Sequence, residues 1–176
     1  IKSPQLYSFA LRHGCNILFN ALEMQKKCEE MFPGNEDKLF TAYNIIDCEK
    51  AREDAKEELD EEYKKFYDTH RVIAFSSRFV EQKCQWDMLK SFELLKKDIP
   101  DAGLIFLGCR GEYENAVREM AKKSEYSNDI VFAGFQKNVF KFVSRADVFA
   151  MTSYYEGFPN VIVEALAVGT PAVSTD

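Results

Sequence analysis

The sequence predicts an α/β fold in which a parallel β-sheet is covered by helices on both faces. From residue 71 onward, short apolar segments alternate regularly with segments of helical periodicity. The short segments are apolar on both sides, which is typical of strands buried between two helical layers. Apolar residues make up 46% of the 176 residues, enough for such a core.

The elements of this region follow one another in order. Strands are predicted at 72–75, 104–107, 130–133 and 148–151, each followed by a helix at 85–99, 112–125, 139–144 and 160–167. The first two helices each have an apolar stripe, such as Trp86, Leu89 and Phe92 in the first. A fifth strand begins at 171, and its helix is absent from the chain, so we expect the domain to be incomplete.

Shorter elements precede this region. Segments 15–19 and 38–43 are predicted as strands, with a helix over 21–32 between them. The acidic segment 48–69 has apolar residues at spacings of four and three, which predicts one surface helix joining two domains. A dedicated binding role for its acidic face is the alternative. The predicted division is therefore residues 1–47, an acidic linker helix at 48–69, and the sheet domain at 70–176.

Charge and cysteine content limit the functional classes. The net charge of −6 argues against nucleic acid as a partner, although nine acidic and five basic residues between Cys48 and Asp68 account for four of these charges. The five cysteines are scattered and odd in number, which argues against a disulfide framework and for a reducing compartment. No signal peptide or run of about 20 apolar residues is apparent, so we expect a cytoplasmic protein.

Ligands of parallel sheets bind outside the carboxyl ends of the strands. The loops at those ends are 76–84, 108–111, 134–137, 152–159 and 175–176. In the first loop, Arg78 offers a planar guanidinium and Lys83 a mobile ammonium, and together they can hold a diphosphate. A basic pair on an exposed loop, without a ligand, is the alternative.

The next two loops are less specific. Gly108 permits close backbone approach to a ligand, but it serves equally well in a tight turn. Phe135 and Gln136 can frame a nucleobase, or Phe135 can pack inward in an ordinary turn. The glycine spacing is not that of a dinucleotide fingerprint.

The fourth loop is the most informative, because Glu156 lies just before a predicted helix and Glu164 about one turn inside it. The turn between them begins with Gly157, Phe158 and Pro159. A helix N-terminus attracts phosphate, which two carboxylates would repel, so we expect them to bind uncharged hydroxyl groups beside it. A sugar nucleotide has both features.

Two other chemistries are disfavoured. In a glycoside hydrolase the two carboxyl groups flank the scissile bond, whereas Glu156 and Glu164 share one turn and helix. His13 and His70 lie outside the predicted ligand loops, and no metal-ligand spacing is present, so no metal is expected.

Residues 71–176 resemble the C-terminal domain of the family 4 retaining glycosyltransferases, also called glycosyl transferases group 1. The motifs that carry the resemblance are Ser77-Arg78-Phe79, Gln82-Lys83-Cys84, Val131–Gly134, Ala146–Phe149, Ser153–Pro159 and Glu164–Pro171. The last two match the family signature most specifically. Residues 15–47 resemble the last strand and helix of the family's N-terminal domain and its linker.

The resemblance implies a GT-B fold, in which two Rossmann-like domains face each other across a cleft. This chain would hold most of the C-terminal domain, truncated at its C-terminal end, and a remnant of the N-terminal one. The reaction implied is sugar transfer from a nucleoside diphosphate sugar with retention of configuration, without a metal or cofactor. A glycan or lipid-linked acceptor would bind through the N-terminal domain, and peripheral membrane contact is compatible with that.

The resemblance also implies residue roles. Arg78 and Lys83 hold the diphosphate and, with Glu156, form the catalytic group. Glu164 binds the ribose hydroxyls, and the backbone near Phe135 and Gln136 contacts the base. The remaining donor-binding residues are Gly108, Gly157, Phe158 and Pro159, of which the amides of Gly157 and Phe158 contact the sugar together with Glu156.

The chain departs from the family at Ser77 and Cys84, which replace glycines on either side of the basic pair. Most of the N-terminal domain is absent, so we expect the isolated chain to be inactive. The alternatives are another GT-B enzyme such as a sugar-nucleotide epimerase, a non-catalytic nucleotide-sugar-binding subunit, or a structural α/β domain. Intact Arg78, Lys83, Glu156 and Glu164 favour the transferase.

Overall fold

The computed structural model describes residues 3–108 and 110–175 and divides into two compact units. The N-terminal unit comprises Ile1–Ile45 and Glu156–Asn160, and the sheet unit comprises Ile46–Tyr155 and Val161–Asp176. Cys109 and Asp176, which belong to two predicted ligand loops, lie outside the described residues. Within those residues, no helix is long and apolar enough to cross a membrane.

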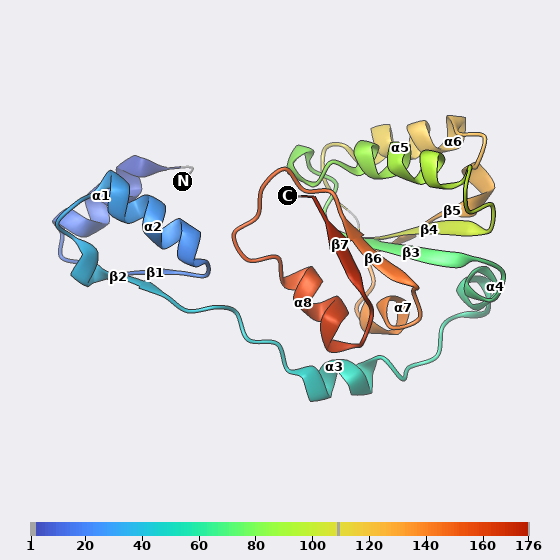
Figure 1. The fold of residues 1–176 in the computed structure, drawn as a ribbon, viewed down its shortest axis with the longest axis horizontal. Coiled ribbons are helices and arrows are strands. Elements are labelled where there is room, and N and C mark those ends of the chain that lie inside the picture. The colour runs from blue at the N-terminus through green and yellow to red at the C-terminus, as the bar shows by residue number, and fades with distance from the viewer. Residues whose placement is uncertain (1–2, 109, 176) are drawn as a thin grey trace. The chain divides into compact units, whose positions relative to one another are not determined.

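Among the described residues, the N-terminal unit contains two parallel strands, two α-helices and a short 3-10 helix (Figure 1). Its elements are α1 (Pro4–Arg12), β1 (Ile17–Phe19), α2 (Leu22–Met31), the short 3-10 helix η1 (Glu36–Lys38) and β2 (Leu39–Thr41). Leu11, Phe19, Cys28 and Leu39 form its small buried core. The two strands and α2 agree with the prediction, whereas α1 was not predicted.

The acidic segment is two helices, so the prediction of one continuous helix is wrong. Helix α3 (Cys48–Asp54) begins at Asp47, whose carboxylate accepts a hydrogen bond from the Lys50 amide (2.9 Å). It ends where Asn138 donates to the Asp54 carbonyl (2.7 Å) and Arg145 donates to the Ala55 carbonyl (3.0 Å). These side chains take carbonyls that a longer helix would use itself. Helix α4 (Glu61–Thr69) then starts afresh.

The sheet unit is built on five parallel strands in the order β5-β4-β3-β6-β7. The strands are β3 (Arg71–Ser76), β4 (Ala102–Leu107), β5 (Ile130–Gly134), β6 (Val148–Met151) and β7 (Ala172–Ser174). The remaining helices are η2 (Glu81–Lys83), α5 (Gln85–Leu95), α6 (Glu114–Lys123), η3 (Ser127–Asp129), α7 (Phe140–Val143) and α8 (Asn160–Ala167). The predicted α/β class with a parallel sheet is confirmed.

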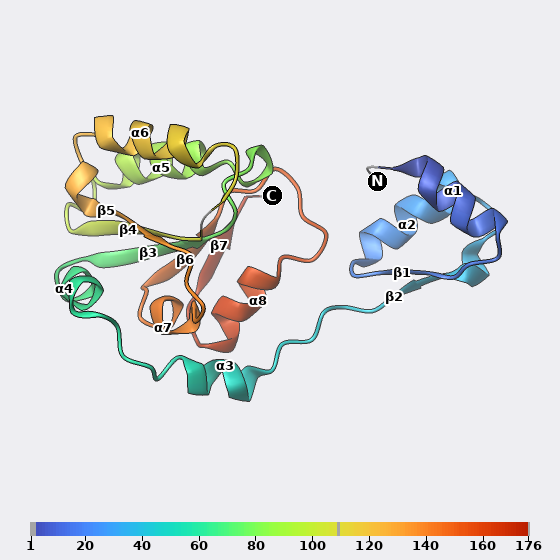
Figure 2. The ribbon, with the colours of Figure 1, turned by 180° about the vertical axis from the view of Figure 1, so that it is seen from behind.

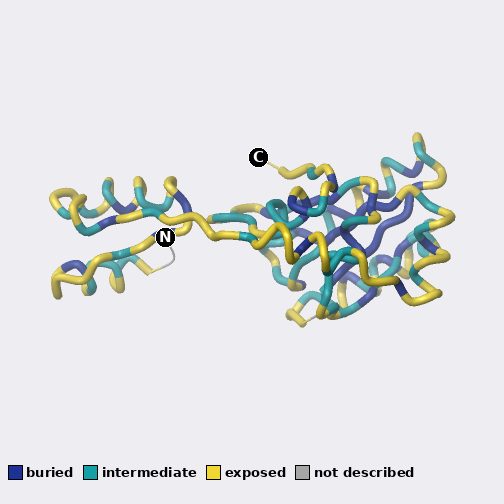
Figure 3. Tube along the Cα trace, turned by 90° about the horizontal axis from the view of Figure 1, so that it is seen from below, coloured by how far each residue is buried: buried dark blue, intermediate teal, exposed yellow. Residues whose placement is uncertain are grey.

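Helices cover both faces of this sheet, with α5 and α6 on one face and α4, α7 and α8 on the other (Figures 1 and 2). Strand β3 shows why, because its residues alternate between two buried clusters. Val72 and Ala74 pack with α4, α7 and α8, whereas Ile73 and Phe75 pack with α5 and α6. Burial is accordingly concentrated along the central strands (Figure 3).

Candidate functional site

The strand order points to one edge of the sheet unit. From β3 the chain proceeds outward through β4 and β5, and it then returns to place β6 on the other side of β3. Ligands of open α/β sheets bind at the carboxyl ends of the strands where the order reverses in this way. The loops after β3 and β6 flank that point, and they contain the predicted basic pair and the beginning of the glutamate loop.

The loop after β3 runs against the loop after β4. The amides of Ser77 and Phe79 donate to the carbonyls of Leu107 (3.0 Å) and Arg110 (3.1 Å). Gly108 has a φ of +124°, and a Cβ built on it would lie 2.2 Å from the Ser77 carbonyl oxygen. The close approach at Gly108 is therefore between two loop backbones, which fixes the shape of the chain around Arg78.

The same basic loop is tied to the loop after β6. Thr152 donates its hydroxyl to the carbonyls of Lys83 (3.1 Å) and Cys84 (3.0 Å). Gln82 accepts a hydrogen bond from the Tyr154 amide (2.9 Å) and donates its own side chain to the Tyr155 carbonyl (2.6 Å). The backbone that carries Lys83 is thus held on the side of β6, and the backbone that carries Arg78 on the side of β4.

A hollow of about 210 Å³ lies at the carboxyl ends of β3, β4 and β5. Its lining includes four residues predicted for the site, Arg78, Gly108, Phe135 and Gln136, together with Ser76, Ser77, Val139 and Val161. Phe135 is 74% exposed, so the alternative in which its ring packs inward is wrong. The hollow is smaller than the range of about 300–1,000 Å³ typical of ligand pockets, so it has room for only part of a nucleotide sugar.

Glu164 lies on α8 in the same unit and is half-buried. Burial raises the pKa of its carboxyl group, because removal from water disfavours the charged form. Hydroxyl groups that donate hydrogen bonds would stabilise the carboxylate without adding charge.

The glutamate loop itself belongs by its contacts to the N-terminal unit. There the Phe158 ring lies 5.6 Å from the Tyr43 ring, and Asn160 accepts a hydrogen bond from Asn44 (2.8 Å). The structure consequently does not place the predicted sugar-binding residues relative to Arg78 or Glu164. These residues are Glu156, Gly157, Phe158 and Pro159.

Residues 56–176 match the family described as "Glycosyl transferases group 1". The chain belongs to this family. It is 31% identical over 97% of its length to an uncharacterized glycosyltransferase of Methanocaldococcus jannaschii, and 27% identical over 86% to an N-acetylgalactosaminyltransferase of Campylobacter jejuni that is named for a diphospho-undecaprenol substrate. It spans 42% and 35% of those two relatives, respectively.

Solved structures of similar fold include HepE of Anabaena in complex with UDP and glucose, with a TM-score of 0.76 at 20% identity over 90% of this chain and 44% of HepE. A glycosyltransferase of Rickettsia africae gives a TM-score of 0.77 at 18% identity, over 99% of this chain and 48% of that one. The assignment of this group 1 chain to the GT-B class of folds is confirmed.

Gln85 and Thr152 hold the basic loop of this group 1 chain, and neither role was predicted from the sequence. Gln85 is fully buried, and its Nε2 donates to Ser77 Oγ (2.9 Å) and to the Arg78 carbonyl (2.7 Å). At the first position of a helix a glutamine is expected to face solvent, so its sequence position gave no signal. Thr152 directly follows a buried strand, and that position is the only feature of the sequence that indicates a place at the site.

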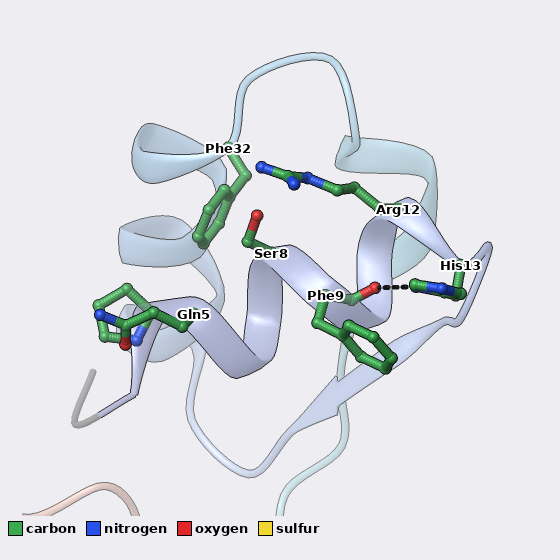
Figure 4. A pocket seen from close by; sticks show the side chains of 7 residues that line it. Gln5, Ser8, Phe9, Arg12, His13 and Phe32 are labelled. Carbon is green, nitrogen blue, oxygen red and sulfur yellow. Dashed lines mark hydrogen bonds between the residues drawn. The ribbon is translucent and has the colours of Figure 1, made fainter.

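Two further features belong to other parts of the chain, one in each unit. A hollow of about 490 Å³ in the N-terminal unit lies between α1 and the end of α2 and is lined by Pro4, Gln5, Ser8, Phe9, Arg12, His13 and Phe32, none of which was predicted for the site (Figure 4). His70 hydrogen-bonds Asp129 (3.1 Å) near the amino ends of β3 and β5. Within residues 3–108 and 110–175, no three His, Cys, Asp or Glu side chains are grouped to hold a metal ion.

Proposed function

We propose that the chain is the donor-binding part of a retaining glycosyltransferase that uses a nucleoside diphosphate sugar. The observation that carries this proposal is the meeting of Arg78, Gly108, Phe135 and Gln136 around one hollow at the carboxyl ends of β3, β4 and β5. Membership of the group 1 family supports it, as does the fold shared with HepE, whose structures hold UDP and UDP-glucose.

Each part of the donor has a candidate partner. The exposed Phe135 ring and Gln136 take the base, Glu164 takes the ribose hydroxyls, and Arg78 and Lys83 take the diphosphate. Glu156, with the amides of Gly157 and Phe158, takes the hydroxyls of the sugar. Pro159 shapes that turn.

Charge stabilisation is the main chemical task of these residues. The bond between the anomeric carbon and the diphosphate oxygen breaks, and the anomeric carbon bonds to an acceptor hydroxyl oxygen, whose proton is released. Negative charge grows on the leaving diphosphate, where a guanidinium and an ammonium lower the barrier. These two cations supply the charge that a metal ion would provide elsewhere, so we propose a reaction without a metal.

The acceptor is a glycan or a lipid-linked glycan, bound by parts of the full-length protein that this chain does not contain. The name of the Campylobacter jejuni relative, which includes a diphospho-undecaprenol substrate, supports this acceptor class, and the chain spans 35% of that relative. We accordingly expect the 176-residue chain alone not to turn over, and the full-length enzyme to work in the cytoplasm with peripheral contact to the membrane.

The test uses the full-length protein with Lys83→Ala and Glu156→Ala, and with Lys90→Ala as a matched control on the exposed face of α5. We expect the first two variants to lose transfer activity with an unchanged circular dichroism spectrum, and the control to retain it. Calorimetric titration with UDP, GDP and ADP identifies the base. Transfer rates near that of the wild type in both site variants would contradict the assigned roles.

A further inference from the structure

Gln85 has no role in the donor site proposed above, but its side chain is hydrogen-bonded to two residues of the loop after β3. It is the first residue of α5 and has 0% exposure, yet its side chain amide is directed to the loop after β3. Ser77 Oγ accepts one bond from Gln85 Nε2 (2.9 Å) and donates to the Arg78 carbonyl (3.0 Å). That carbonyl also accepts the second bond from Gln85 Nε2 (2.7 Å). The three groups form a closed triangle.

The Gln85 amide makes both hydrogen bonds through Nε2, but its other polar atom is left unsatisfied. Its Oε1 atom is buried and has no hydrogen-bond partner among the described residues. A buried carbonyl oxygen without a partner reduces stability, and such groups in native structures call for an explanation. An apolar side chain of the same size would avoid this cost. The two bonds to the Ser77–Arg78 segment are what Gln85 adds in return.

These bonds complete the restraint of the backbone on both sides of Arg78. The Val80 amide also donates to the Arg78 carbonyl (3.1 Å), and the Ser77 amide donates to the Leu107 carbonyl (3.0 Å). On the other side, the buried Phe79 ring lies 6.0 Å from the ring of Phe106. With its carbonyl held by three donors, Arg78 has a fixed backbone, and the residue lines the hollow.

We propose that Gln85 is a positioning residue that, together with Ser77, directs the Arg78 side chain toward the diphosphate of the donor. This inference rests on the proposed function. Ser77 stands where a glycine is expected, and a glycine could not complete the triangle, so the Ser77–Gln85 pair adds a restraint on this loop that a glycine would lack. A fixed backbone at Arg78 limits the space that the guanidinium can sample, so less conformational freedom is lost when it binds the diphosphate.

The test is Gln85→Met in the full-length protein. Methionine has a similar volume and removes both donors together with the unpaired oxygen, so the free energy of unfolding should change little. Affinity is measured by calorimetry for whichever of UDP, GDP and ADP binds most tightly, and for its nucleoside. We expect the diphosphate to bind about tenfold more weakly, and the nucleoside to bind as in the wild type.

Two comparisons make the result specific. Thr170→Val removes another buried side-chain bond, from Thr170 Oγ1 to the Val143 carbonyl (2.7 Å), and should leave diphosphate affinity unchanged. In an Arg78→Ala background, Gln85→Met should cause no further loss of affinity, because it acts through Arg78. If Gln85→Met folds poorly, Ser77→Ala removes two sides of the triangle, the bond from Gln85 to Ser77 Oγ and the bond from Ser77 Oγ to the Arg78 carbonyl, and must weaken diphosphate binding selectively.

The outcomes separate the two proposals. Wild-type affinity in Gln85→Met, or an equal loss with and without Arg78, overturns the positioning role while the donor site stands. Wild-type affinity in Arg78→Ala, or no binding of any of the three diphosphates by the wild type, overturns the assignment of the donor site, and the inference falls with it.

Discussion

Gly108→Ala is expected to destabilise the fold strongly through two effects, one on the backbone conformation and one steric. The backbone at Gly108 has a φ of +124°, a conformation that residues with a Cβ rarely adopt. In addition, the new Cβ would lie 2.2 Å from the carbonyl oxygen of Ser77, a backbone atom that cannot rotate away. That oxygen could move only if the loop that carries Arg78 moved as well.

The magnitude follows from these two parts. The unfavourable backbone conformation costs about 1–2 kcal/mol, and forcing an atom into a packed site adds about 1–3 kcal/mol. Gly169→Ala in the same unit isolates the first part, because Gly169 has a φ of +90° and no atom within 4 Å of its built Cβ. We therefore expect a loss of about 1 kcal/mol for Gly169→Ala and of about 3 kcal/mol for Gly108→Ala.

Urea unfolding measures both losses. Trp86 is the only tryptophan in the 176 residues, and it lies in the sheet unit with its ring 5.2 Å from that of Tyr113, so its fluorescence reports on this unit. Gly108→Ala should also weaken nucleoside diphosphate binding, whereas Gly169→Ala should not. Equal destabilisation of the two variants, to within about 0.5 kcal/mol, would refute the close approach of the two loops.

Two further predictions concern carboxyl groups of the sheet unit. Burial acts to raise the pKa of Asp129, but hydrogen bonds from Lys96 and His70 outweigh it and hold the pKa below its usual value. Asp129→Asn leaves Lys96, whose side chain is 5% exposed, without its counter-charge 2.6 Å away, and should lower the free energy of unfolding by about 3 kcal/mol at pH 7. Because a depressed pKa stabilises the fold above about pH 4, this difference should shrink as the pH falls below 4, and a constant difference would contradict the assignment. Glu164→Gln should raise the urea midpoint at pH 7, since burial raises the pKa of Glu164 and the charged form is penalised in the folded state. The same variant should weaken nucleoside binding, and an unchanged midpoint with unchanged affinity would count against both the burial and the ribose role.

The sheet unit could be predicted well from sequence because its strands are buried on both faces. A segment such as 104–107 has no polar alternation that could be mistaken for a surface strand, and β4 is buried at every residue. Once the strands were assigned, parallel connection placed their following loops at one edge. The meeting of Arg78, Gly108, Phe135 and Gln136 followed from that rule alone.

The features that escaped prediction depend on partners far away in the sequence. The spacing of apolar residues through the acidic segment fits one helix, and the break arises because Asn138 and Arg145 take the carbonyls of Asp54 and Ala55. No local pattern reveals those donors. Gln85 escaped for the same reason, since only the folded chain brings Ser77 and the Arg78 carbonyl to it.

The structure explains why residues 77 and 84 can be other than the glycines that the family resemblance led us to expect. Cys84 adopts the left-handed conformation that a glycine would provide, with φ of +48°, and its thiol is buried. Ser77 needs no such conformation, because the close approach is provided from the opposite loop by Gly108 and Gly111, whose built Cβ atoms would lie 2.2 and 1.9 Å from the carbonyls of Ser77 and Phe79. The basic loop is therefore shaped by its neighbours, and a side chain at 77 becomes available to bond Gln85. Restoring glycine at 77 would therefore preserve the approach of the loops and remove the two bonds of Ser77 Oγ, whereas Gln85 and the Val80 amide would still donate to the Arg78 carbonyl.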